Sequence, residues 1–180
     1  MRIISGTYKG RRLQPPTDIK ARPTTDFAKE SLFNVLNNRI DFDEIEVLDL
    51  FSGTGSIALE FISRGCKMAT AIEIEQKHCN FINNSCKILN ITNLSILKTD
   101  VFRFIQHSNK QFDLIFADPP YTLKELPLLP ELVLNSSLLK PGGLFILEHS
   151  AKNDFSQLPY FSEHRKYGNV NFSFFSVNLV

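Results

Sequence analysis

The sequence has no tryptophan, and it holds only three cysteines and four histidines. The cysteines form no CxxC pair and are odd in number, which argues against a disulfide framework. No histidine stands at zinc-ligand spacing from a cysteine, so we expect no metal site. No apolar run reaches the length of a membrane span, and the first residues lack the apolar core of a signal peptide. We therefore expect a soluble protein of the reducing cytoplasm.

The net charge is also small, only +1 over 180 residues. Its distribution is more informative than its total. Residues 1–22 carry six basic side chains and one acidic one, a net of +5, which leaves −4 for the rest of the chain. This asymmetry suggests an arm that meets phosphates, although a solvated polar terminus fits the charge equally well. The candidate RNA contacts in this arm are Arg2, Lys9, Arg11 and Arg12.

A chain of this length and ordinary globular composition is expected to form one domain. Its first 40 residues differ in pattern from the remainder. Residues 1–13 indicate two short strands about a turn that contains Gly6 and Gly10. A helix is then predicted to begin after Thr24 or Thr25 and to fade by 37–39. Its apolar face consists of Ala28, Leu32, Val35 and Leu36.

From residue 46 onward strands and helices alternate, which is the pattern of a parallel sheet covered on both faces. The predicted strands are 46–51, 68–74, 94–99, 112–117 and 144–148. The predicted helices are 56–64, 76–89, 101–107 and 123–138, the last delayed by two prolines. Residues 161–166 and 170–177 predict an antiparallel hairpin, because no crossover helix fits between them. Phe174 and Phe175 break its alternation, so we expect a bulge or burial on both faces.

Polar features follow the first three strands, at the edge where α/β sheets bind ligands. Gly53 and Gly55 in DLFSGTGS allow a sharp turn onto a helix N-terminus. Glu73 follows Gly53 by 20 residues and can accept from ribose hydroxyls. Asp100 can accept from an adenine amino group, although singly these features also fit a turn, a loop carboxylate and a helix N-cap. The candidate cofactor-binding residues are Asp49, Phe51, Gly53, Gly55, Glu73, Ile74, Asp100, Val101 and Phe102.

The fourth feature ends the apolar strand 112–117 in a stiff turn, because proline fixes φ and lacks an N–H. It presents the Asp118 carboxylate, the Pro119 carbonyl and the Tyr121 ring, a set that suits a flat heterocycle with an exocyclic amino group. Alone, the sequence DPPY fits an ordinary Pro-Pro turn. Together, the four features indicate an adenosine-containing ligand across three strands and an amino-bearing base beside the fourth. The candidate catalytic residues are Asp118, Pro119, Pro120 and Tyr121.

A dinucleotide oxidoreductase is an alternative, because residues 53–58 also match GxGxxA. That alternative leaves Asp118–Tyr121 unexplained, and 180 residues leave little space for a substrate domain. S-adenosylmethionine fits better, because its reactive methyl would point from the first strand toward the fourth.

These motifs resemble those of the class I S-adenosylmethionine-dependent methyltransferases, in which DLFSGTGS is similar to the glycine-rich motif and DPPY to the amino-methylating (N/D)PP(Y/F) motif. More narrowly, MRIISGTYKGRRL, RPTTDFAKESLFNVL and GGLFILEHS make the chain similar to the bacterial 16S ribosomal RNA guanine-N2 methyltransferases of the RsmD type. The resemblance implies an α/β, Rossmann-like methyltransferase domain over 41–180, after a hairpin and helix extension over 1–40. Its seven-stranded, mostly parallel sheet would have the order 3-2-1-4-5-7-6.

The resemblance also implies S-adenosyl-L-methionine as cofactor, with its methionine end at Asp49, Gly53 and Gly55. Glu73 would hold the ribose, Asp100 the adenine and Asp118–Tyr121 the target guanine. The family's amino-terminal motif is matched by Arg22, Thr24, Glu30 and Phe33, which we expect beside the pocket and the RNA.

The expected partner is ribosomal RNA or the assembling small ribosomal subunit, with no membrane, and we expect a monomer. An amino methyltransferase acting on DNA adenine or cytosine, or on another RNA, stays open. So does a cofactor-binding module without catalysis.

Overall fold

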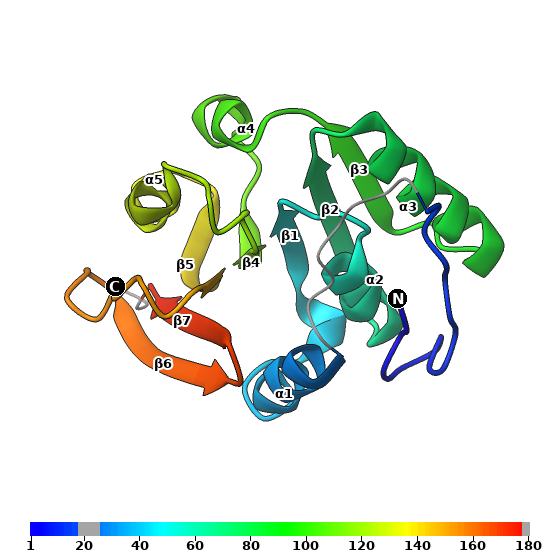
Figure 1. Cartoon of the computed structure of the whole chain (residues 1–180), viewed down its shortest axis with the longest axis horizontal. Helices are drawn as coiled ribbons and strands as arrows, with labels where there is room; N and C mark the ends of the chain where they lie inside the picture. Colours follow the sequence, from blue (N-terminus) through cyan, green and yellow to red (C-terminus); the bar gives the residue numbers. More distant parts are fainter. Residues whose placement is uncertain (18–25, 178–180) are drawn as a thin grey trace.

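The computed structural model describes residues 1–17 and 26–177, which are built on one sheet of seven strands (Figure 1). The strand order is β3-β2-β1-β4-β5-β7-β6, as predicted. Five strands are parallel: β1 (Glu46–Leu50), β2 (Met68–Glu73), β3 (Leu94–Lys98), β4 (Phe112–Ala117) and β5 (Leu139–His149). The antiparallel pair is β6 (Phe161–Tyr167) and β7 (Val170–Ser176).

Helices cover both faces of this sheet. One face packs against α4 (Val101–His107) and α5 (Leu129–Leu134), and the other packs against α1 (Asp26–Leu36) and α2 (Ser56–Ser63). The amino-terminal residues Ile3 and Leu13 join α2 and α3 (Gln76–Leu89) in a smaller cluster. Two short 3-10 helices, η1 (Phe42–Glu44) and η2 (Leu126–Leu128), precede β1 and α5. Within the described ranges no helix is long and apolar enough to cross a membrane.

The antiparallel pairing expected in residues 1–13 is present, although a single bridge, between Arg2 and Arg12, replaces two regular strands. Backbone hydrogen bonds join Ile3 to Gly10 and Arg11, and Met1 to Leu13. In addition, the backbone N–H groups of Ile4 and Ser5 donate to the two carboxylate oxygens of Glu60 in α2, at 2.8 and 3.0 Å. The segment is therefore a short, irregular hairpin docked on a helix, which we call the amino-terminal arm (residues 1–13).

Two predictions around the fifth strand are also corrected. The helix expected over 123–138 is only the 3-10 turn η2 and the short α5, with Pro127 and Pro130 in their first turns. The strand expected to start at 144 begins at Leu139 and carries Pro141-Gly142-Gly143 inside it. A register shift opposite residues 112–114 of β4 accommodates these three residues as a bulge.

The predicted closing hairpin is confirmed, including the disturbance at Phe174 and Phe175. Both rings are buried, and β7 is buried on both faces over 170–175. Phe175 pairs with Phe161, whereas Phe174 pairs with Glu163, so the extra residue of the bulge is Ser162 on β6. The division of the chain near residue 40 stays a prediction.

Candidate active site

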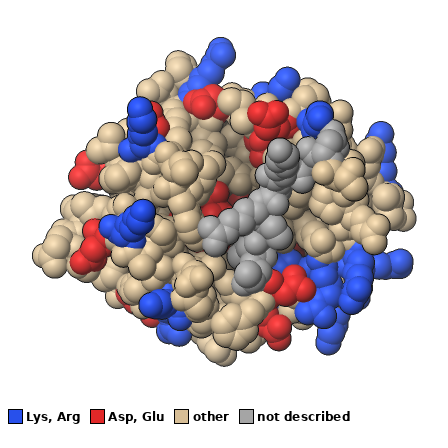
Figure 2. All heavy atoms as spheres, in the orientation of Figure 1, with Lys and Arg blue, Asp and Glu red and all other residues tan. Residues whose placement is uncertain are grey.

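A cavity of about 510 Å³ opens at the carboxyl ends of the parallel strands, and the hollow in Figure 2 marks its mouth. Most of the predicted residues line it, from β1, β2, the start of α4 and the end of β4. They are Asp49, Phe51, Gly53, Glu73, Ile74, Asp100, Val101, Asp118, Pro119, Pro120 and Tyr121. Gly55 and Phe102 do not line it. The structure therefore brings the glycine loop and the DPPY turn to one cavity.

Glu73 braces the glycine loop against the end of β2. Its Oε2 accepts a hydrogen bond from the Gly53 N–H at 2.7 Å, and its Oε1 accepts one from the Glu75 N–H at 2.8 Å. The imidazole Nδ1 of His78 lies 3.3 Å from the same Oε2. Each carboxylate oxygen has two lone pairs, so these bonds leave capacity for a further donor from the cavity.

Gly55 serves the backbone of this loop. Its φ of +74° is left-handed, and it is the residue that precedes α2. A Cβ there would lie 2.9 Å from the Ile82 side chain of α3. Gly55 therefore turns the chain and allows α2 to pack on α3, and its predicted contact with a ligand stays a prediction.

Asp49 lies at the end of β1 and is buried at the floor of the cavity. Its Oδ2 accepts from the Ala58 N–H in the first turns of α2, at 3.1 Å. Burial raises the pKa of Asp49 to about 8, against the opposing effects of the Ala58 N–H and the Ser52 hydroxyl. Asp49 thus ties the strand to the helix that follows the glycine loop.

The side of the cavity formed by the glycine loop and the start of α4 is aromatic and polar. Phe51 has a φ of +61°, rare for a bulky residue, and its ring meets Phe102 edge-on with centroids 6.4 Å apart. Phe102 therefore supports Phe51 from behind. Asp100 is the N-cap of α4, since it accepts from the Arg103 N–H at 3.0 Å, and it lines the cavity as well.

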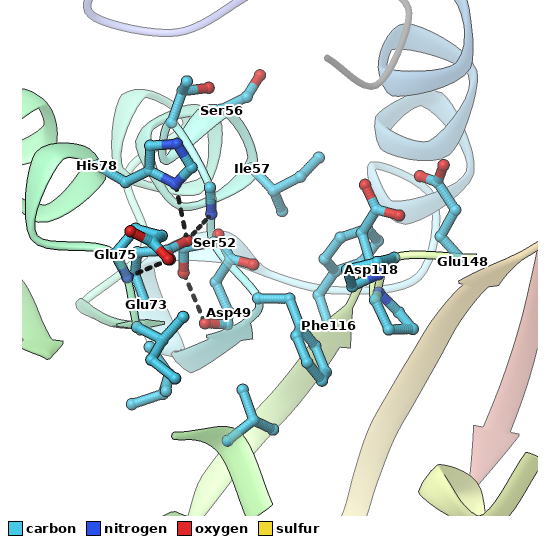
Figure 3. A pocket seen from close by; sticks show the side chains of 18 of the residues that line it. Asp49, Ser52, Ser56, Ile57, Glu73, Glu75, His78, Phe116, Asp118 and Glu148 are labelled. Carbon is cyan, nitrogen blue, oxygen red and sulfur yellow. Dashed lines mark hydrogen bonds and ion pairs between the residues drawn. The ribbon is translucent and has the colours of Figure 1, made fainter. Parts of the chain in front are cut away.

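The opposite wall is the DPPY turn together with Glu148, a residue that the sequence did not single out. The Tyr121 hydroxyl donates to Glu148 Oε1 at 3.1 Å, and Glu148 is 4% exposed near the end of β5. Figure 3 shows Asp118 and Glu148 side by side, facing Asp49 and Glu73 across the cavity. The rule that polar residues at strand ends bind ligands, applied to the fifth strand, would have found it.

The cavity is acidic. Six carboxylate residues line it, and no lysine or arginine of the described ranges does. No three metal-ligating side chains of residues 1–17 and 26–177 converge as a metal ion would require. A low-dielectric cavity with this lining favours a cationic ligand. The six are Asp49, Glu73, Glu75, Asp100, Asp118 and Glu148.

The predicted RNA contacts lie on a different surface. The side chains of Arg2, Lys9, Arg11 and Arg12 are exposed on the arm, and Figure 2 shows basic side chains gathered over it, to one side of the hollow. The Arg2 Nε lies 3.1 Å from Asp26 Oδ2 at the start of α1. Arg22 and Thr24, and the cap expected at Thr24 or Thr25, lie outside the described residues.

A buried ion pair connects this arm to the cavity. Lys29 of α1 is 1% exposed, and its Nζ lies 3.6 Å from Glu60 Oε2, whose side chain is fully buried. The same Nζ donates to the Arg2 carbonyl at 2.6 Å and to the hydroxyl of Ser56 at 3.1 Å. Burial lowers the pKa of Lys29, while Glu60 opposes this shift. Because Ser56 lines the cavity, the pair links the arm, α1 and the start of α2.

Comparison with known proteins agrees with this arrangement. This chain has the same fold as the solved structure titled "Putative methyltransferase yhhF from Escherichia coli". The TM-score is 0.85 and the identity 25%, and the match covers 100% of this chain and 99% of that one. An RNA methyltransferase from Salinibacter ruber, solved with S-adenosyl-L-homocysteine, has the same fold, with a TM-score of 0.68, 13% identity and coverage of 87% and 94%. The predicted class I methyltransferase fold is confirmed.

Sequence relatives identify the family more narrowly. The "Ribosomal RNA small subunit methyltransferase D" of Buchnera aphidicola is 33% identical over 148 residues, which are 82% of this chain and 75% of that protein. The family described as "Conserved hypothetical protein 95" matches residues 1–176. The chain therefore belongs to this family of RsmD-type methyltransferases, which its motifs resemble.

Proposed function

We propose that this protein transfers a methyl group from S-adenosyl-L-methionine to the exocyclic N2 amino group of a guanine in 16S ribosomal RNA. The observation that carries the proposal is that one cavity is lined by the glycine loop after β1, by acids after β2 and β3, and by Asp118–Tyr121 after β4. The Buchnera relative is named a ribosomal RNA small subunit methyltransferase, and the Salinibacter structure contains the demethylated form of the proposed cofactor.

The lining of the cavity fits this cofactor. S-adenosylmethionine carries a sulfonium and an ammonium charge, which an acidic lining without a described lysine or arginine would attract. Asp49 does not add to this attraction at neutral pH, because its pKa is raised to about 8. Glu73 has lone pairs left for ribose hydroxyls, and Asp100 can accept from the adenine amino group. Ile74 and Val101 offer apolar contact to the adenine ring. When bound, the cofactor supplies an electrophilic methyl group.

The target base would enter beside the DPPY turn. A guanine amino group is a poor nucleophile, because its lone pair is delocalised into the ring. Hydrogen bonds to Asp118 and to the Pro119 carbonyl would hold its two hydrogens and favour a pyramidal nitrogen. The Tyr121 ring can stack on the base, and its hydroxyl bond to Glu148 fixes the ring in place. Most of the acceleration would come from alignment and local electrostatics.

The arm and α1 complete the proposal. Exposed arginines of the arm would neutralise phosphates, while the target base is extruded from its stack into the cavity. Residues 1–40 would thus be the RNA-facing extension and 41–180 the catalytic domain. We propose that the protein acts in the cytoplasm as a monomer, on ribosomal RNA that is free or within an assembling small subunit.

The test is incubation of the protein with methyl-labelled cofactor and small ribosomal subunits, or the RNA extracted from them, from a strain that lacks the gene. Digestion to nucleosides should place the label in N2-methylguanosine. Label in adenosine or cytidine would contradict the guanine assignment, and label in added DNA would favour a DNA amino methyltransferase. Bound cofactor without any transfer would indicate a binding module.

A further inference from the structure

Phe27 is an exposed aromatic residue in the first turn of α1. Its side chain is 64% exposed, although α1 buries neighbours such as Ala28 and Leu32 against the sheet. The ring meets the Tyr167 ring edge-on, with centroids 6.2 Å apart and planes at 80°. Most of the Phe27 ring is thus open to solvent beside a second aromatic ring.

This aromatic pair lies at the rim of the cavity. Tyr167 ends β6 and pairs with Val170 across the two-residue turn into β7. Val170 itself lines the cavity. Its neighbour Asn171 pairs with His149 at the end of β5, directly after Glu148. Figure 1 shows α1 beside this end of the hairpin. Phe27 and Tyr167, which we call the aromatic rim, therefore adjoin the wall proposed for the target base.

Cationic groups flank the aromatic rim on two sides. Asp26, next to Phe27, holds the guanidinium of Arg2 at 3.1 Å and so brings the arm to the start of α1. On the other side, Arg165 lies two residues before Tyr167 on the same face of β6, where its guanidinium contacts Glu163 and the Tyr167 side chain. An aromatic plane set among cations is the arrangement with which proteins bind single-stranded nucleic acid. The rim thus lies between the surface proposed for phosphates and the cavity proposed for a base.

We propose that the aromatic rim stacks a nucleobase that is adjacent in the RNA to the methylated guanine. The inference rests on the proposed function. When a base is extruded into the cavity, its neighbour in the chain loses a stacking partner at the rim. The Phe27 ring replaces that partner, with the Tyr167 ring packed edge-on against it. Stacking tolerates any base, so the rim contributes affinity and position rather than sequence recognition.

The absence of tryptophan from the chain makes a direct test available. In Phe27→Trp the introduced tryptophan is the sole one, so its fluorescence reports this position alone. Addition of small ribosomal subunits from a strain lacking the gene, or of RNA extracted from them, should quench it by stacking. The matched control is Ile88→Trp, because Ile88 is 71% exposed near the far end of α3, at the sheet edge opposite the cavity. The control should not be quenched.

A second variant separates this inference from the proposed function. Phe27→Ala should raise the KM for RNA about 5- to 150-fold, the range expected for loss of one base stack, with an unchanged KM for the cofactor. Phe27→Trp should restore the KM for RNA. If the wild type methylates guanine but the introduced tryptophan stays unquenched and Phe27→Ala keeps the wild-type KM, the rim is overturned and the proposed function stands. No methylation by the wild type overturns both.

Discussion

The cavity and the amino-terminal arm carry charges of opposite sign. Six acidic residues line the cavity, of which the buried Asp49 keeps its proton at neutral pH, whereas Arg2, Lys9, Arg11 and Arg12 of the arm are exposed. The chain total of +1 conceals this contrast. The proposed ligands differ in the same sense, because S-adenosylmethionine is cationic at its reactive end and RNA is a polyanion. Because the two charges lie on separate surfaces, the acidic cavity can attract the cofactor while the basic arm attracts RNA.

The two regions differ again in how they are held. The glycine loop is fixed by hydrogen bonds to Glu73, whereas the arm is fixed by the buried Glu60 and Lys29. Lys29 also donates a hydrogen bond to Ser56, which lines the cavity. The arm and the cavity therefore differ in charge but are connected by hydrogen bonds through Lys29. Each of the following variants is expected to affect one region and spare the other, or to break the connection.

The largest effect is expected from Asp118→Ala. Turnover should fall about 10²- to 10⁴-fold, because the target amino group loses the acceptor that orients it. The dissociation constant of the cofactor should change little, as measured by calorimetry. Asp43→Ala is the control, because Asp43 is exposed and precedes β1 at the opposite edge of the sheet. Near-normal turnover in Asp118→Ala would refute its assigned role.

Lys29→Met should break the connection between the regions. It removes one of the two cations on the buried Glu60 carboxylate, because Arg64 Nε still lies 2.9 Å from Oε1. The loss of unfolding free energy should therefore stay below the about 3–5 kcal/mol that is typical of a buried charge left without any partner. Urea denaturation measures this loss, and Lys87→Met at an exposed site on α3 is the control. Proteolysis should also become faster within the arm. Equal stability of the two variants would mean that the ion pair does not hold the arm.

The raised pKa of Asp49 at the floor of the cavity predicts that the free energy of unfolding depends on pH. Its pKa is raised from 3.8 to about 8, so the folded state keeps a proton that the unfolded state releases. Its contribution is full below pH 4 and is lost as the pH rises to about 8. The free energy of unfolding should therefore fall over this range more steeply in the wild type than in Asp49→Asn. Parallel pH curves for the two proteins would contradict the assignment.

The smallest effect per residue is expected in the arm. Arg11→Ala or Arg12→Ala should weaken RNA binding and reduce the slope of log K against log salt by about one unit for each phosphate that is no longer neutralised. Cofactor affinity should not change. Lys87→Ala removes an exposed cation from α3 and should leave the slope as it is. An unchanged slope in the arginine variants would show that the arm does not meet phosphates.

Local sequence patterns predicted the strand ends and most of the residues that line the cavity. The periodicity of apolar residues and the residues that form turns can both be recognised within short segments of the sequence. The bounds of α3, α4 and β4 were predicted to the residue. Glu148 was missed, because its role depends on β5 lying beside β4 and on the Tyr121 hydroxyl reaching it.

The arm shows the limit of local reasoning most clearly. Its sequence predicted two short strands about a turn, and the backbone pairing of Ile3 with Gly10 and Arg11 does form. The docking of this hairpin could not be predicted, because the side chain of Glu60, more than 50 positions away, takes the backbone donors of Ile4 and Ser5. Lys29 is buried for the same reason, although lysine on a helix is usually exposed. Both outcomes follow from a charge pair between distant segments, which no local pattern encodes.

The central claim is that the reactive methyl group lies between the glycine loop and the DPPY turn. The most direct measurement is nuclear Overhauser contact between the ¹³C-labelled methyl of bound S-adenosylmethionine and the protein, without RNA. The account predicts contacts to Pro119, Pro120 or Tyr121. Contacts confined to the side of Ile74 and Val101 would place the methyl away from the target base and would contradict it.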